Sequence, residues 1–167
     1  MPHKKPASKK SATALHRDIG KQNPFDLPEQ EAYLNLRRTA NLLADEFAAL
    51  FKSRGLSETG YNILRILRAA PPQGLPCLDV ADQLVRKMPD ITRLTNRLLE
   101  KGWIARNRSK QDKRVVLLTL TPAGKRLVDA LDQPVLDLHQ QQLGHLSQKQ
   151  LNTLARLLEQ ARQTTTD

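Results

Sequence analysis

The chain has 167 residues, about the length of one domain, and it is long enough to bury a hydrophobic core. Lysine and arginine number 27 against 17 aspartates and glutamates, so the formal net charge of +10 favours a polyanionic partner such as nucleic acid. Aromatic residues make up only 4% of the chain, which argues against a protein that binds single strands by stacking their bases on aromatic side chains.

The cysteine content and the hydropathy of the chain indicate the cellular compartment in which we expect the protein. The single cysteine, Cys77, excludes an intramolecular disulfide and a cysteine-based zinc finger, and it fits a reducing compartment. No apolar run approaches the roughly 18–20 residues that a membrane span needs, and the basic start of the chain lacks the apolar stretch of a signal peptide. We therefore expect a cytoplasmic protein with no membrane partner.

The positive charge is concentrated in two segments. Residues 1–23 carry a net charge of +5 and residues 56–120 carry +6, whereas residues 24–55 carry −1 and residues 121–167 are neutral. The first segment mixes Lys, Pro, Ser and Ala without an apolar period, so we expect a basic disordered tail. Two interpretations of this tail stay open: a basic arm over DNA phosphates, or a solvated tail without a specific role.

Helical periodicity begins at Asp26, an acidic cap, and continues with apolar residues three to four positions apart until Gly55. Ser57 is a typical N-cap for a second helix. Pro71 and Pro72 must end that helix, because neither can donate to its hydrogen-bond ladder. These signals predict two successive helices with a glycine stop between them.

A short helix, a longer helix and two strands are expected next. The short helix carries the apolar residues Leu78, Ala81, Leu84 and Val85. The longer helix opens at Pro89 and closes at Gly102. The runs at 103–108 and 115–120 are then extended in character and are separated by a polar segment, which predicts a hairpin.

Two amphipathic helices follow the hairpin. Thr121 and Pro122 supply an N-cap and a first-turn proline for a long helix, which Pro134 is expected to kink. Ser147 and Gln150 form a capping box for the last helix. The expected fold is therefore mainly α-helical with a small β-hairpin, which is an α+β arrangement.

The helix that opens at Pro89 and the hairpin carry the chemistry. Ile91, Leu94 and Leu98 form the inner face of this helix. The side chains that must face outward are Thr92, Arg93, Asn96 and Arg97. Arginine can contact guanine and asparagine can contact adenine in a major groove. A basic amphipathic helix alone is more often a solvated surface helix, so it is the order of helix, turn, helix and basic hairpin that predicts a winged helix-turn-helix.

The segments 56–71 and 80–127 resemble the MarR family of bacterial transcription regulators. The most specific elements are Asp112-Lys113-Arg114, which matches the family's Asp-x-Arg wing signature, and the Thr-Pro-Ala-Gly sequence that begins at Thr121. Weaker similarity extends over residues 27–163 and leaves the basic tail unexplained.

The resemblance implies which side chains meet DNA. Arg114 enters the minor groove while Asp112 holds its guanidinium in place. The residues at or near the major groove are Pro89, Asp90, Thr92, Arg93, Asn96 and Arg97. The residues that add phosphate contacts are Lys87, Arg106, Arg108, Lys110 and Lys113. Asp90 suits the helix dipole better than a phosphate backbone, so we expect it to cap the helix.

The neutral flanks at 24–55 and 121–167 are leucine-rich and amphipathic, which suits helix packing. The resemblance implies that they form a helical dimerisation region around a winged helix-turn-helix domain at 56–120. A twofold dimer sets two recognition helices about 34–36 Å apart and reads a pseudo-palindromic duplex. The alternative, that the same leucines cover the core of a monomer, stays open.

Catalysis and metal binding find no support in the sequence. The chain has no Gly-rich phosphate loop, nucleophile elbow or HExxH pair. His139 and His145 are six residues apart, which does not place them on one helix face. Cys77 lies away from the position of the family's peroxide-sensing cysteine, so we expect a structural thiol. No enzyme activity, metal or cofactor is expected.

The leading hypothesis is a homodimeric, sequence-specific DNA-binding repressor that is released by a small effector, in the bacterial cytoplasm and associated with the nucleoid. Effectors in the family are often small aromatic acids bound between the dimerisation and DNA-binding regions. The alternative is an architectural or non-specific nucleic-acid-binding protein that uses the tail at 1–23. This alternative predicts a steep salt dependence and little preference among sequences.

Overall fold

The computed structural model describes residues 13–85 and 90–163. The chain divides into two compact units, residues 1–45 and residues 46–167, and each unit is described by itself.

The first unit contains a helix that the sequence did not predict. Helix α1 (Ala14–Asp18) lies within the segment for which we expected a disordered tail. Leu15, His16 and Phe25 are all buried, and the His16 ring packs edge-on against Phe25 with ring centroids 4.5 Å apart. The expectation of disorder is therefore wrong for α1, because tertiary burial and not an apolar repeat stabilises this turn. Residues 1–12 of the expected tail lie outside the described residues.

Helix α2 (Pro28–Ser53) begins at the proline expected in its first turn and ends just before Gly55. Large apolar side chains on α2 and immediately before it lie in solvent. Leu27, Tyr33 and Leu42 each expose more than half of their surface. An apolar face this exposed is available for packing against another surface.

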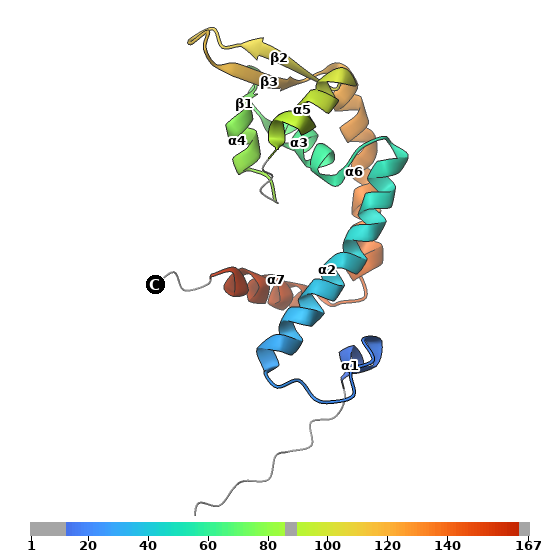
Figure 1. Ribbon diagram of the computed structural model, residues 1–167. Coiled ribbons are helices and arrows are strands. Elements are labelled where there is room, and N and C mark those ends of the chain that lie inside the picture. The colour runs from blue at the N-terminus through green and yellow to red at the C-terminus, as the bar shows by residue number, and fades with distance from the viewer. Residues whose placement is uncertain (1–12, 86–89, 164–167) are drawn as a thin grey trace, which may run out of the picture. The chain divides into compact units, whose positions relative to one another are not determined.

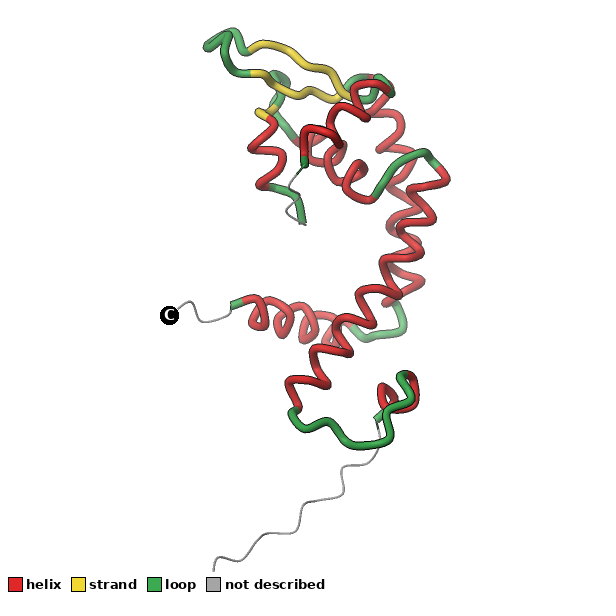
Figure 2. Tube along the Cα trace, viewed as in Figure 1, coloured by secondary structure: helices red, strands yellow, loops and turns green. Residues whose placement is uncertain are grey.

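The described part of the second unit combines helices with a three-stranded sheet (Figure 1). After the end of α2, the helices are α3 (Glu58–Ala69), α4 (Cys77–Asp82), α5 (Ile91–Glu100), α6 (Pro122–Leu143) and α7 (Gln148–Arg162). The strands are β1 (Leu75–Pro76), β2 (Ile104–Arg108) and β3 (Val116–Leu120). Strand β3 lies in the middle and pairs antiparallel with both neighbours. The turn between β2 and β3 projects from the end of the sheet (Figure 2).

Most predicted elements of this unit are confirmed, including the mainly α-helical fold with a small antiparallel sheet. Ser57, Thr121 and Ser147 cap α3, α6 and α7, and each side-chain oxygen accepts the backbone amide three residues later. Helix α6 continues through Pro134 to its end. The kink expected at this proline stays a prediction.

Strand β1 was not predicted from the sequence. Its Leu75 pairs with Leu118 of β3, far along the chain. The preceding Gly74 has a φ of +90°, and a Cβ atom there would collide with the Leu118 carbonyl, so glycine is what allows this close approach. A search for alternating apolar runs cannot find a strand of two residues, since its pairing depends on a distant partner.

The apolar face predicted for the third helix, now α4, needs correction. The helix ends at Asp82, so Leu84 and Val85 lie beyond it. Leu78 is 74% exposed and Val85 is 92% exposed, although Leu84 is buried. The prediction was wrong for Val85 because it extended a helical period past the end of a short helix, and wrong for Leu78 because this residue lies on the exposed side of α4.

One hydrophobic core joins α3, α4, α6 and the sheet. Its most deeply buried side chains include Ile63, Leu64, Val80, Leu118, Val128 and Leu131. Because these residues come from four different elements, the core fixes the position of α3 at the centre of the unit.

An ion-pair cluster at the edge of the core joins α3 to α6. Arg68 makes two bonds to the Asp132 carboxylate, at 2.7 and 2.9 Å, and one to Asp129 at 3.0 Å. Lys125 lies 2.6 Å from Asp129. The hydrogen bond from Arg68 lowers the pKa of Asp132, and bonds from Lys125 and then Arg68 lower the pKa of Asp129. The cluster therefore stabilises the fold when both carboxylates are ionised.

We expect the substitution Arg68→Met to lower the midpoint of thermal unfolding at pH 7 by about 2–4 °C, because it removes a bidentate ion pair. The folded-state pKa of each aspartate is depressed, so the contribution is complete above the unfolded pKa, which is near the ordinary value of 3.8. It is lost as the pH falls through the folded pKa. The difference between wild type and variant should therefore shrink in acid.

The matched control is Arg126→Met, which removes the same charge from an exposed position on α6 outside the cluster. Calorimetry across the pH range makes the measurement. An equal loss in the control, or a difference that does not shrink as the pH falls below 3.8, contradicts the assignment.

Candidate nucleic-acid interface

Helix α5 has one buried face and one polar face. Ile91, Thr95 and Leu98 are buried, and Leu94 packs against the core. The side chains on the opposite face are exposed, as the apolar spacing predicted: Thr92, Arg93, Asn96 and Arg97. Hydrogen-bonding groups therefore occupy the whole solvent face of this helix.

Two polar residues at the start of α5 have structural roles. The Asp90 carboxylate accepts the backbone amide of Arg93 at 3.0 Å, which confirms the expected N-cap. Thr95 was missed because a threonine is not apolar. It is fully buried, and its hydroxyl satisfies itself by donating to the Thr92 carbonyl at 3.0 Å. Both contacts stabilise the N-terminal part of α5, which carries the first exposed side chains.

The wing, defined as residues 104–120, consists of β2, β3 and the turn between them. The Ser109 amide donates to the Val115 carbonyl at 2.9 Å, and the Ser109 hydroxyl accepts the Gln111 amide at 3.2 Å. The exposed cations that this turn and β2 present are Arg106, Arg108, Lys110, Lys113 and Arg114. A hydrogen-bonded turn thus holds a row of positive charge in solvent.

Asp112 acts on Arg114 through the backbone. Its Oδ1 accepts the Arg114 amide at 2.9 Å. The resemblance implied a hold on the Arg114 guanidinium, and the contact that the structure shows is this shorter-range one. The carboxylate closes an Asx-type turn, so it sets the direction in which the Arg114 side chain leaves the wing.

A side-chain contact connects α5 to the wing. One Nη atom of Arg106, on β2, donates to Oδ1 of Asn96 at 2.7 Å. Arg108, two residues along the same strand, instead donates to the Lys113 carbonyl within the wing at 3.3 Å. The polar face of α5 and the wing are therefore parts of one surface.

The structure brings together the described members of the predicted site. All eleven are exposed, and the carboxylates of Asp90 and Asp112 are both engaged by backbone amides. Lys87 and Pro89, the remaining predicted contacts, lie outside the described residues. The described surface is cationic, because seven of the eleven exposed residues are arginine or lysine and two are aspartate.

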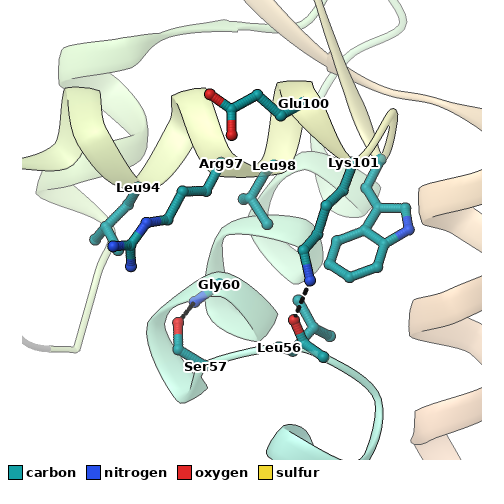
Figure 3. A pocket seen from close by; sticks show the side chains of 10 residues that line it. Leu56, Ser57, Gly60, Leu94, Arg97, Leu98, Glu100 and Lys101 are labelled. Carbon is teal, nitrogen blue, oxygen red and sulfur yellow. Dashed lines mark hydrogen bonds between the residues drawn. The ribbon is translucent and has the colours of Figure 1, made fainter.

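A pocket of about 430 Å³ lies between α5 and the start of α3 (Figure 3). Leu56, Leu94 and Leu98 supply apolar lining. Lys101 donates to the Gly55 carbonyl at 2.7 Å, and its ammonium lies 4.7 Å from the centre of the Trp103 ring. Arg97, which also belongs to the solvent face of α5, lines the same pocket. This pocket was not predicted from the sequence, because its walls come from separate elements.

Other site types find no support in the described residues. Within them, no group of three or more His, Cys, Asp or Glu side chains is placed to hold a metal ion. Cys77 is half-buried at the start of α4 and packs against the core, which supports a structural thiol. The described helices also lack the combination of length and apolar character that a membrane crossing requires.

The chain is similar to known transcription regulators. A family model described as the MarR family matches residues 56–116. Over 69 residues the chain is 44% identical to the multiple antibiotic resistance protein MarR of Salmonella typhimurium, a match that covers 41% of this chain and 48% of that protein. The chain thus spans about half the length of this relative.

Similarity to solved structures is more extensive. A MarR transcription factor from Planctomyces limnophilus is 43% identical, with 81% of this chain and 98% of that chain covered and a TM-score of 0.63. Sco3205, a MarR family transcriptional regulator from Streptomyces coelicolor solved in complex with DNA, has a TM-score of 0.76. Its identity is 20%, with 88% of this chain and 94% of that chain covered, so this likeness concerns the fold alone.

The cap at Asp90 leads to a test of its structural role. Asp90→Ala should lower the free energy of unfolding by about 1 kcal/mol, because an amide at the start of α5 loses its acceptor. Asp90→Ser keeps a capping oxygen and should remain close to wild type. Urea unfolding measures both variants. Equal losses in the two would show that capping is not the role of this side chain.

Proposed function

The chain belongs to the MarR family of transcription regulators, and we propose that it is a homodimeric, sequence-specific DNA-binding repressor that a small-molecule effector releases from DNA. The observation that carries this proposal is the exposed face of α5, where four hydrogen-bonding side chains lie beside a cationic wing. Such a helix fits the width of a major groove, while the wing reaches the neighbouring backbone and minor groove.

The DNA contacts proposed for each side chain follow from its chemistry. Arg93 and Arg97 have the fork of donors that matches the O6 and N7 atoms of guanine. Arg114, whose direction is set by Asp112, suits the negative potential of a narrow minor groove. In this proposal the exposed Arg108 and Lys110 of the wing contact phosphates. Base contacts then specify the site, and phosphate contacts hold the register.

A dimer is supported by apolar surface that stays uncovered in one chain. No residue of α7 is buried, and Leu154 and Leu157 are 40% and 52% exposed. Tyr33 and Leu42 on α2 are likewise exposed. Packing against a second copy removes such area from water, and twofold symmetry then presents two copies of α5 to paired half-sites.

The compartment and the absence of catalysis are also proposed. A repressor acts where the chromosome is, so we place the protein in the bacterial cytoplasm at the nucleoid. The solved structures described above are named as a transcription factor and a transcriptional regulator, and the exposed face of α5 with the wing suits binding. We therefore infer that the protein is not an enzyme.

Selection of bound fragments from genomic DNA by the purified protein tests this function. We expect enrichment of a pseudo-palindrome, and we expect the same motif from a variant that lacks residues 1–12. This deletion leaves α1 and its contact with Phe25 in place. Enrichment of no motif, or loss of the motif in the deletion, would favour the architectural alternative, in which the basic tail leads binding.

Arg93→Ala should weaken binding to the selected site by about 1–3 kcal/mol, with a smaller loss on random DNA, if this arginine reads a base. Arg126→Ala, with the same charge change on α6, is the control and should change neither affinity by much. Fluorescence anisotropy on both duplexes makes the measurement. Equal losses on selected and random DNA would reduce Arg93 to a phosphate contact.

The pocket between α5 and the start of α3 is the proposed effector site. The Lys101 ammonium, the Trp103 indole and the apolar side chains that line the pocket suit a small aromatic acid. A ligand near Arg97 would draw the Arg97 side chain away from DNA. Benzoate should change the fluorescence of Trp103, the single tryptophan, and should weaken DNA binding in parallel. Benzylamine, a cation of similar shape, is the control. No fluorescence change with benzoate, or an equal change with benzylamine, would contradict this placement.

A further inference from the structure

The bond between Arg106 and Asn96 restricts how Asn96 can read a base. A guanidinium has only donors, so the group that faces it must be the carbonyl oxygen of the Asn96 amide. In the opposite orientation, the amide hydrogens would point at a cation. The 2.7 Å contact therefore fixes which end of the carboxamide faces the wing. The donor end, Nδ2, remains for another partner.

Arg106 is anchored well enough to impose this orientation. It occupies the middle of β2, paired with Leu118 of the central strand β3. Leu118 is 1% exposed, and Ile104 at the start of β2 is 2% exposed, so both strands are held by the core. Asn96 lies on the solvent face of α5, directly after the buried Thr95. The two exposed side chains therefore meet from elements that the core holds in place, and their bond favours this orientation of the amide.

We propose that Arg106 is a positioning residue, which turns Asn96 into a hydrogen-bond donor that reads the N7 atom of a purine. This inference rests on the proposed function and specifies how one of its contacts works. A bidentate contact with adenine needs the amide oxygen to face the N6 amino group as well. Here the bond from Arg106 uses one lone pair of that oxygen and turns it toward β2, so recognition depends mainly on the N7 acceptor.

The same bond changes the role expected for Arg106. A side chain that only neutralises a phosphate contributes equally to every sequence. An arginine that orients Asn96 contributes mainly at the base pair that Asn96 reads. Arg108 is the natural comparison, because it lies on the same strand with the same charge and bonds within the wing.

The test begins with the base pair at which Asn96→Ala relaxes sequence preference in the selected site. Replacing the purine of that pair by its 7-deaza analogue should weaken wild-type binding about tenfold and leave Asn96→Ala unaffected. Where that purine is adenine, unsubstituted purine, which lacks the 6-amino group, should bind almost as well as adenine. A loss with unsubstituted purine as large as the 7-deaza loss would overturn the proposal in favour of bidentate reading.

A double-mutant cycle tests the contribution of Arg106. Arg106→Ala should reduce the 7-deaza effect by about three- to tenfold, and in the Asn96→Ala background it should add only a uniform loss. Arg108→Ala should weaken binding to all sequences and leave the 7-deaza effect intact. Additive losses in the Arg106 and Asn96 cycle would overturn the positioning role. Circular dichroism of each variant confirms that it is folded.

Different results would contradict the proposed function and the positioning role of Arg106. If the wild-type protein shows no preference among sequences, the proposed function is wrong. If the wild type prefers its selected site and the 7-deaza effect is the same with and without Arg106, only the present inference is wrong.

Discussion

The division of α5 into a buried face and an exposed face is the constraint on which the interface depends. Burial of Ile91 and Leu98 contributes roughly 1.5–3 kcal/mol each, and this burial sets the rotation of the helix about its own axis. The rotation decides which side chains reach solvent. Rotation of the helix by one residue would bury an arginine, and the free-energy cost of burying this charge exceeds the gain from apolar packing. The polar face therefore follows from packing, before any contact with a ligand.

The elements around α5 make this surface rigid. The ion pairs of Arg68 join α3 to α6, and the core encloses α3, so the support on which α5 rests has little freedom. Asp90 and Asp112 are used to cap the helix and to close the wing turn. The arginine and lysine side chains of the surface outnumber these two carboxylates, so the surface stays cationic. A preorganised cationic surface loses less entropy on binding than one assembled from mobile arginines.

Much of this arrangement was predictable from sequence because it depends on local signals. The caps at Ser57 and Thr121 and the apolar spacing of α5 act within a few residues, and they located the helices and the outward face. Features that depend on distant partners were not predictable. Strand β1 exists through its pairing with β3, and α1 exists through Phe25. The bond from Arg106 to Asn96 likewise depends on how β2 and α5 lie against the same core.

The central claim is that this surface reads sequence and does not merely attract phosphate. The most direct measurement is the ratio of two dissociation constants at about 150 mM salt, one for the selected site and one for a duplex of the same length and composition in scrambled order. The account predicts tighter binding to the selected site by at least about a thousandfold. Equal dissociation constants for the two duplexes would contradict it.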